Sequence, residues 1–183
     1  GGARLTGLLP GGGELVLGSP KGAIPFTRIE ALAKVFADAG LPACASENIT
    51  AFLWGKLLYN CCLNPFSALL GVNYGRLGEY SSTRAVIREV IREVFGVAQV
   101  LRQPMLWSGT EEYEAILFGD LIPRTAAHFA SMCSDLRRGK RTEIDALNGA
   151  IWRLGQKGGI PTPTNACLTL RVKARERLNS SVL

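Results

Sequence analysis

The chain has 183 residues, of which 47% are hydrophobic and 20% are charged, and its net charge is +6. This composition predicts a folded protein with one good core, or one domain plus part of another, and excludes a disordered tail. The apolar runs are interrupted by Lys56, by glycines or by prolines before they reach the roughly 20 residues of a membrane span. We therefore expect no membrane partner.

The positive charge is dense in only one run, RRGKR at residues 137–141, which has no interleaved aromatic residues. That pattern favours a solvated loop between helices over a nucleic-acid surface. A mild positive charge also suits an anionic small substrate or a phosphorylated cofactor. We therefore expect a small-molecule partner and no nucleic acid.

The cysteines are odd in number, include one adjacent pair and form no C-x-x-C motif. They are Cys44, Cys61, Cys62, Cys133 and Cys167. This pattern fits neither a disulfide framework nor a zinc site. We expect reduced thiols in a cytoplasmic protein, and no metal ion.

Residues 1–46 begin as a glycine-rich, strand-like segment. ARLTGLLPGGGELVLG predicts two short strands around a turn at residues 11–13. PFTRIEALAKVFADAG predicts an amphipathic helix that stops at Gly40, and LPACAS predicts one more strand. The apolar face of that helix comprises Ile29, Leu32, Ala33 and Phe36. A strand, helix, strand order in so short a segment is typical of the tail of an α/β domain.

From Glu47 onward the predicted elements are helical. The run STRAVIREVIREVFGVAQVLR has a strong 3.6-residue period, with isoleucine and valine on one broad face. That face could pack in the core or at a homodimer interface, and the sequence does not distinguish these.

Three more helices are predicted near the C-terminus. PRTAAHFASMCSDLRRG predicts a helix that ends at Gly139, and TEIDALNGAIWRLGQKGG predicts a helix that opens with Thr142 and Asp145 spaced as a capping box. In GIPTPTNACLTLRVKARERL, Thr162 is the predicted N-cap and Pro163 the first helical residue.

The stretch FLWGKLLYNCCLNP combines an apolar helix with a narrow polar stripe. Residues 50–63 carry apolar side chains on almost every azimuth, which places this helix inside a helical domain. Lys56 and Asn60 lie one turn apart on the same face. Pro65 disfavours helical geometry at Asn64, so we expect the helix to end there. Because an ammonium is costly to bury, two interpretations stay open: Lys56 snorkels outward, or it meets a ligand in a cleft.

Three separated motifs, in the right order, resemble one enzyme family. WGKLLYNCCLNPFSALLG, SMCSDLRRGKRTEIDALNGAI and GIPTPTN resemble the C-terminal domain of the ketopantoate reductases (2-dehydropantoate 2-reductases). The resemblance covers residues 47–183 and implies a mainly α domain similar to the C-terminal part of 6-phosphogluconate dehydrogenase. It also implies that residues 1–46 are the last strands and helix, a short α/β remnant, of a Rossmann-type NADP-binding domain.

The resemblance implies a reaction and the residues that serve it. Family members use NADPH to reduce a 2-oxo acid, ketopantoate, to pantoate on the route to pantothenate and coenzyme A. Lys56 matches the catalytic lysine, a general acid that polarises the keto oxygen and donates the proton, and Glu143 matches the carboxylate that takes the substrate's hydroxyl. Asn60, Asn64 and Ser131 match substrate-binding positions. We expect Lys56 to lie near Glu143 in a dry crevice, where a cation stabilises developing alkoxide charge.

Two departures limit what the resemblance implies. The chain has no G-x-G-x-x-G fingerprint, so we expect no cofactor-binding residues in it, NADPH held mainly by a domain that it lacks, and no turnover by the chain alone. Tyr74 stands where some members have a substrate-contacting asparagine, which leaves the identity of the 2-oxo acid open. The alternatives are a reductase of a different 2-oxo acid and a non-catalytic helical dimerisation module.

Overall fold

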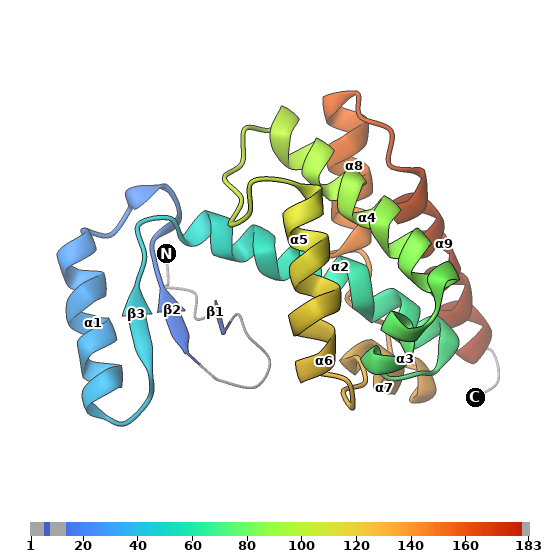
Figure 1. The fold of residues 1–183 in the computed structure, drawn as a ribbon, viewed down its shortest axis with the longest axis horizontal. Coiled ribbons are helices and arrows are strands. Elements are labelled where there is room, and N and C mark those ends of the chain that lie inside the picture. The colour runs from blue at the N-terminus through green and yellow to red at the C-terminus, as the bar shows by residue number, and fades with distance from the viewer. Residues whose placement is uncertain (1–5, 8–13, 181–183) are drawn as a thin grey trace. The chain divides into compact units, whose positions relative to one another are not determined.

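The computed structural model describes residues 6–7 and 14–180. The chain divides into two compact units. The first comprises Gly1–Lys56 and Gln103–Ser108, and the second comprises Leu57–Arg102 and Gly109–Leu183. The described strands lie in the first unit, and the described elements of the second unit are helical (Figure 1).

The first unit has a small sheet with one helix beside it. Its elements are β1 (Thr6–Gly7), β2 (Leu15–Leu17), η1 (Pro20–Gly22), α1 (Phe26–Asp38) and β3 (Ala43–Ala45). β1 pairs antiparallel with β2, and β2 pairs parallel with β3. Because parallel neighbours need a crossover connection, α1 joins β2 to β3. The predicted strand, helix, strand order is confirmed, whereas the predicted turn at residues 11–13 lies outside the described residues.

α1 packs one face against β2 and β3 (Figure 1). The packed cluster includes Leu17, Ile29 and Ala33, and Ile24, Phe36, Ala43 and Ala45 pack against it. Leu32, which the periodicity also assigned to this face, is 39% exposed because it lies at the edge of the apolar stripe. The helix stops before Gly40, as predicted, and the φ of +82° at that glycine is one that other residues rarely adopt.

α2 (Ile49–Leu70) continues through Pro65, so the prediction that this helix ends at Asn64 is wrong. A proline inside a helix removes the N–H that would bond the carbonyl four residues earlier. That carbonyl belongs to Cys61, and it accepts a 3.2 Å hydrogen bond from Nδ2 of Asn148 instead. A side chain from a distant segment therefore replaces the missing donor, and the helix runs on.

The second unit packs its helices around residues 61–67 of α2, which are buried. Its remaining elements are α3 (Tyr74–Glu79), α4 (Ser81–Val100), α5 (Thr110–Ile116), the π-helical turn η2 (Leu117–Leu121), α6 (Ile122–Arg124), α7 (Ser131–Arg137), α8 (Asn148–Gly158) and α9 (Pro163–Ser180). α4, α8 and α9 pack against one another (Figure 1). The predicted class, a mainly α domain after a small α/β segment, is confirmed.

α4 turns its broad apolar face into the core of the second unit. The buried positions are Ile87, Val90, Ile91, Val94, Val97 and Ala98. Of the two packing modes that the sequence left open for this face, the structure shows core packing. A homodimer stays a prediction.

The prediction of a single helix over PRTAAHFASMCSDLRRG is wrong. The structure has two helices there, α6 and α7, which residues 125–130 separate. In that interval the carbonyls of Ala126 and His128 accept hydrogen bonds of 2.9 Å from the backbone N–H groups of Gly75 and Tyr74. Those N–H groups lie in the first turn of α3, where a helix offers them no acceptor of its own. In one long helix these carbonyls would accept hydrogen bonds from N–H groups of the same helix. Here they accept hydrogen bonds from α3 instead.

The capping box predicted at Thr142 and Asp145 is also wrong, because α8 begins at Asn148. The backbone N–H and the Oγ1 of Thr142 both donate to Oε1 of Glu176 at 2.6 Å. The carboxylate of Asp145 accepts hydrogen bonds of 2.9 Å from Nζ of Lys173. Both partners lie on α9, so the two would-be capping residues bind a neighbouring helix, and the segment between them forms irregular turns.

α9 begins at Pro163, as predicted, which puts Thr162 at the N-cap position. The first free N–H groups of α9, those of Thr164 and Asn165, donate to the carboxylate of Glu93 on α4 at 2.7 and 2.9 Å. A carboxylate at this end of a helix also offsets the positive end of the helix dipole. Glu93 therefore anchors α9 to α4.

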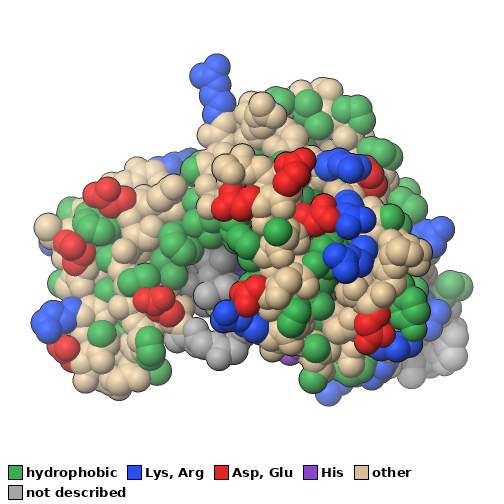
Figure 2. Space-filling model, viewed as in Figure 1, with side chains coloured by type: hydrophobic (Ala, Val, Ile, Leu, Met, Phe, Trp, Pro, Cys, Tyr) green, Lys and Arg blue, Asp and Glu red, His purple; other side chains and the backbone are tan. Residues whose placement is uncertain are grey.

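The surface of the helical unit mixes charges of both signs, and Figure 2 shows basic and acidic side chains side by side on one face. Arg88 pairs with Glu114, and Arg92 pairs with Glu89. Among the helices of the described part, none has the length and apolar character that crossing a membrane requires.

Candidate active site

The centre of the candidate site is a contact between α2 and the irregular segment before α8. Nδ2 of Asn64 donates a long hydrogen bond of 3.4 Å to Oε1 of Glu143, which lies 79 residues further along the chain. Asn64 is 4% exposed, whereas Glu143 is exposed. The arrangement thus presents a carboxylate at the surface and holds it from below with a buried amide.

Local structure fixes the backbone of Glu143. The neighbours on both sides, Thr142 and Ile144, are buried and anchor the segment. The carbonyl of Glu143 accepts the N–H groups of Ala146 and Leu147, at 2.9 and 3.2 Å, in a tight turn. Glu143 therefore lies in a turn and not in the first turn of a helix, and this turn fixes its backbone while its exposed side chain contacts Asn64.

Tyr74 is a member of the site that the motifs did not assign. Its O–H donates a 2.8 Å hydrogen bond to Oδ1 of Asn64, and the residue is 3% exposed. Burial raises the pKa of the Tyr74 phenol well above its ordinary value, so the group stays a neutral donor. The sequence flagged Tyr74 only as a departure from the family pattern. Its spacing of ten residues from Asn64, across the end of α2, gave no signal of this contact.

The remaining predicted site residues have separate surroundings. Asn60 is half-buried one turn before Asn64 on α2, and Ser131 is exposed at the start of α7. Within the described residues, neither side chain has a hydrogen-bond partner. The structure thus joins Asn64 to Glu143 but does not bond Ser131 to either of them.

Lys56 is the last α2 residue of the first unit, and its side chain is exposed. The expectation of an ammonium in a dry crevice is therefore wrong for this chain. The physical reason lies in the helix itself: α2 is buried on all sides only from residue 61 to residue 67, beyond the turn that carries Lys56. An exposed ammonium is accessible to a ligand.

Among the residues that the structure describes, the connection from strand to helix does not have the sequence of a dinucleotide phosphate site. A glycine-rich turn between a strand and a helix, G-x-G-x-x-G, does not occur in the sequence. β2 and α1 are joined instead by GSPKGAIP, which includes the short turn η1. A metal site is not indicated either, since the described residues contain no group of three His, Cys, Asp or Glu side chains able to hold an ion.

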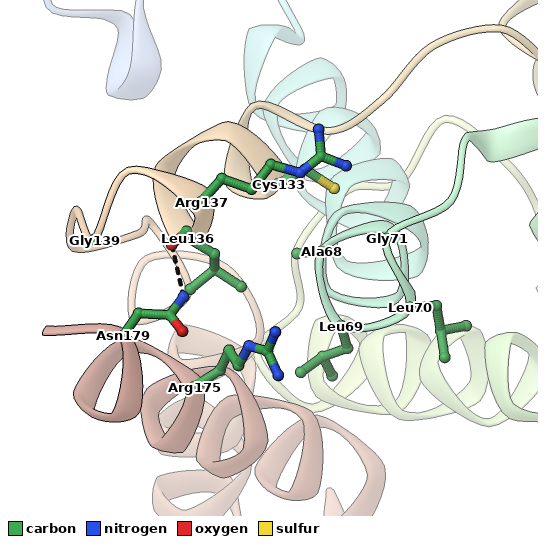
Figure 3. A pocket seen from close by; sticks show the side chains of 10 residues that line it. All are labelled: Ala68, Leu69, Leu70, Gly71, Cys133, Leu136, Arg137, Gly139, Arg175 and Asn179. Atoms are coloured by element: carbon green, nitrogen blue, oxygen red, sulfur yellow. Dashed lines mark hydrogen bonds between the residues drawn. The ribbon is translucent and has the colours of Figure 1, made fainter. Parts of the chain in front are cut away.

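A pocket of about 510 Å³ opens elsewhere on the helical unit (Figure 3). Arg137 of α7 and Arg175 of α9 extend along it, and Asn179 donates to the carbonyl of Leu136 at 2.6 Å. The C-terminal ends of α2 and α7 line this pocket, and helix C-termini carry partial negative charge that guanidinium groups offset. No predicted site residue lines the pocket.

Comparison with known proteins assigns the chain to a family. The family described as "Ketopantoate reductase PanE/ApbA C terminal" matches residues 48–176. The chain belongs to the ketopantoate reductase family. The matched residues, 48–176, include α2, both residues of the Asn64–Glu143 contact and most of α9. The three motifs that carried the resemblance therefore lie within the matched region.

The ketopantoate reductase relatives are longer than this chain. It is 43% identical over 166 residues to the 2-dehydropantoate 2-reductase of Aquifex aeolicus, a match that covers 91% of this chain and 53% of that protein. With the corresponding protein of Pyrococcus horikoshii it shares 31% identity over 159 residues, which covers 87% of this chain and 50% of that protein. The chain thus spans about half the length of these curated relatives.

Solved structures resemble the fold at a similar level. A PanE/ApbA family ketopantoate reductase from Ralstonia eutropha superposes with a TM-score of 0.78 and 36% identity, covering 92% of this chain and 53% of that one. D-mandelate dehydrogenase, in a ternary structure with NADH and anilino(oxo)acetate, superposes with a TM-score of 0.82 and 31% identity, covering 93% and 69%.

Proposed function

We propose that the chain is the C-terminal catalytic domain of a cytoplasmic, NADPH-dependent 2-dehydropantoate 2-reductase that reduces ketopantoate to pantoate in pantothenate and coenzyme A synthesis. The observation that carries this proposal is the hydrogen bond between Asn64 and Glu143. It joins two positions of separate family motifs, and it leaves the carboxylate exposed. The chain is similar over about nine-tenths of its length to a protein named 2-dehydropantoate 2-reductase, and this similarity supports ketopantoate as the substrate.

Each site residue has a role in the proposal. Glu143 accepts the hydrogen bond of a substrate hydroxyl, because an ionised carboxylate is an acceptor only. Asn60 and Ser131, which have no partner among the described residues, bind the substrate's oxygens. Asn64 holds Glu143 and contributes its second N–H to the substrate.

Lys56 is the proton donor of the proposed reaction. As the keto carbon is reduced, its oxygen gains negative charge, and a nearby ammonium both stabilises that charge and gives the oxygen a proton. NADPH supplies the hydride when bound. Because the chain has no glycine-rich cradle, residues outside it hold most of that cofactor.

The test is Lys56→Ala in the product of the complete gene. We expect turnover of ketopantoate to fall by about 10²- to 10⁴-fold, the usual contribution of a positioned general acid. The melting temperature should not change, because the side chain is exposed. Lys56→Arg is the informative partner variant, since it keeps the charge but gives up a proton far less readily, and it should also be slow.

Lys140→Ala, at another exposed lysine, is the control and should leave turnover unchanged. If Lys56→Ala retains full turnover, the catalytic role is wrong. A changed stability with unchanged kinetics would favour the non-catalytic helical module.

A reductase of a different 2-oxo acid is the second candidate. Two observations favour it: Tyr74 stands at a substrate-contacting position of the family, and D-mandelate dehydrogenase is among the similar structures. A panel of 2-oxo acids separates the two. We expect the highest kcat/KM with ketopantoate, and a higher value with a phenyl-substituted 2-oxo acid would identify the second candidate as correct.

A further inference from the structure

We infer that Tyr74 is a positioning residue for the proposed substrate site: its O–H fixes the orientation of the Asn64 amide, and through it the Glu143 carboxylate. This inference rests on the proposed function. It differs from the role of the asparagine that some family members have here, because the phenol of Tyr74 bonds a protein side chain and not a ligand.

The two ends of the Asn64 amide have different partners, and each partner demands one orientation. Tyr74 donates to Oδ1 at 2.8 Å, and Nδ2 donates to Glu143 at 3.4 Å. A flipped amide would place its oxygen against a carboxylate that can only accept. Asn64 is 4% exposed, so losing either partner would leave a polar group of the amide with little access to water.

The shorter of the two hydrogen bonds is the one that sets the orientation. At 3.4 Å, the contact with Glu143 lies beyond the usual range for an N–H···O hydrogen bond, so it restrains the amide weakly. The bond from Tyr74 has a normal O–H···O length, and burial raises the pKa of its phenol, which keeps the donor proton in place. Loss of that proton donor would free the amide to turn away from Glu143.

The ring that carries this donor is itself held on several sides. Tyr59 packs edge-on against Tyr74, with ring centroids 6.0 Å apart and planes at 83°, and His128 lies 5.3 Å away. The backbone N–H groups of Tyr74 and Gly75 both donate to the segment after α6. The phenol O–H therefore reaches Asn64 from a fixed position, which is what a positioning group needs.

The orientation also limits what the site offers a substrate. Because Tyr74 donates to one of the two lone pairs of Oδ1 of Asn64, the amide offers a ligand its second N–H and the one remaining lone pair. Glu143, in contrast, offers only acceptors. The pair is thus suited to a 2-oxo acid that carries both an acceptor oxygen and, close to it, a hydroxyl donor.

The experiment compares Tyr74→Phe with Tyr59→Phe in the product of the complete gene. Each variant removes one phenol O–H and keeps the ring, but the O–H of Tyr59 bonds Thr125 and does not contact Asn64. For Tyr74→Phe we expect a three- to tenfold rise in KM for the 2-oxo acid, about the worth of one hydrogen bond, with kcat within about twofold. Tyr59→Phe should leave KM unchanged.

A double variant distinguishes positioning from general stability. In an Asn64→Ala background the amide is absent, so Tyr74→Phe should add no further rise in KM. The inference is overturned if Tyr74→Phe leaves KM unchanged, if Tyr59→Phe raises it equally, or if the effect of Tyr74→Phe persists without the amide.

A second readout needs no activity and uses the 183-residue chain itself. We expect the side-chain amide signals of Asn64 in NMR spectra to shift and exchange faster in Tyr74→Phe than in Tyr59→Phe. If the wild-type gene product reduces no 2-oxo acid but the Asn64 signals respond as expected, the proposed function fails and the positioning contact stands. Active enzyme with unresponsive Asn64 signals would overturn the positioning contact alone.

Discussion

Asp145 is held by two basic side chains from different segments. Its carboxylate accepts hydrogen bonds from Nζ of Lys173 at 2.9 Å and from Nη2 of Arg141 at 3.2 Å. The hydrogen bond from Lys173 is the largest cause that lowers the pKa of Asp145 below its ordinary value of 3.8. The side chains of Asp145 and Lys173 are 32% and 35% exposed, so water screens their attraction.

We therefore expect Asp145→Asn to lower the free energy of unfolding by about 0.5–1 kcal/mol at neutral pH. Because the folded-state pKa lies below the unfolded one, this stabilisation is complete above about pH 4 and is lost as the pH falls through the folded-state value. Urea unfolding at neutral pH and at about pH 2 should show the difference between the two proteins vanish in acid. Asp38→Asn, which breaks the exposed pair with Lys34, should change stability by less than about 0.5 kcal/mol. A deficit for Asp145→Asn that is equal at both pH values would contradict the ion-pair role.

At the residue scale, the sequence assigned site positions from motifs but did not predict the hydrogen-bond partners of those positions. Asn64 and Glu143 were assigned from motifs, and the structure brings them together. The contact with Tyr74 and the binding of Thr142 by Glu176 were not predicted, because hydrogen bonds between segments leave no periodic trace in a sequence. For Lys56 the residues alone left two interpretations open, and its exposed side chain agrees with the one in which it extends outward and not with the dry crevice expected from the resemblance.

At the element scale, the course of α2 depends on a side chain outside it. Asn148 is 0% exposed, and its Nδ2 donates both to the carbonyl of Cys61, which Pro65 leaves without a helical partner, and to Oδ1 of Asn165 at 2.9 Å. Asn165 in turn donates to Glu93 at 2.7 Å. A series of hydrogen bonds through Asn148 and Asn165 thus links α2, α8, α9 and α4.

We expect Asn148→Ala to lower the free energy of unfolding by about 2–3 kcal/mol, because two buried acceptors lose their donor. Pro65→Ala supplies a backbone N–H to Cys61 and should recover about 1 kcal/mol of this loss in the double variant. Chemical unfolding of the wild type, the two single variants and the double variant measures that coupling. Strictly additive effects would show that Asn148 does not compensate for Pro65.

The helices that were predicted well are those whose burial follows one continuous stripe. α1 and α4 have that pattern, and α9 begins where its Pro163 signal placed it. The failures at residues 125–130 and 142–147 share one cause. In both segments, groups that could have served a local helix bind a neighbouring one, α3 or α9, and a local pattern cannot reveal that competition.

At the scale of the whole molecule, the three motifs were sufficient for the family because each is a contiguous run, and the family match covers them all. The division into two compact units within α2, between Lys56 and Leu57, was not predicted. A domain boundary is predicted from a change in amino-acid composition, and the sequence shows no such change at residues 56 and 57 because one helix runs through them. The proposed proton donor and the carboxylate Glu143 therefore belong to different units, although Lys56 and Asn60 share one helix.

This division and the missing glycine-rich turn lead to a prediction for the chain as a whole. We expect the 183-residue chain alone not to oxidise NADPH with ketopantoate, since it offers the dinucleotide phosphates no strand-to-helix cradle. NADPH should also leave its melting temperature unchanged, because a ligand stabilises a protein only in proportion to its binding. The product of the complete gene should show both turnover and a rise in melting temperature, and its Lys56→Ala variant should keep the rise while losing turnover. Appreciable turnover by the chain alone would mean that it holds the nicotinamide through residues other than a glycine-rich turn.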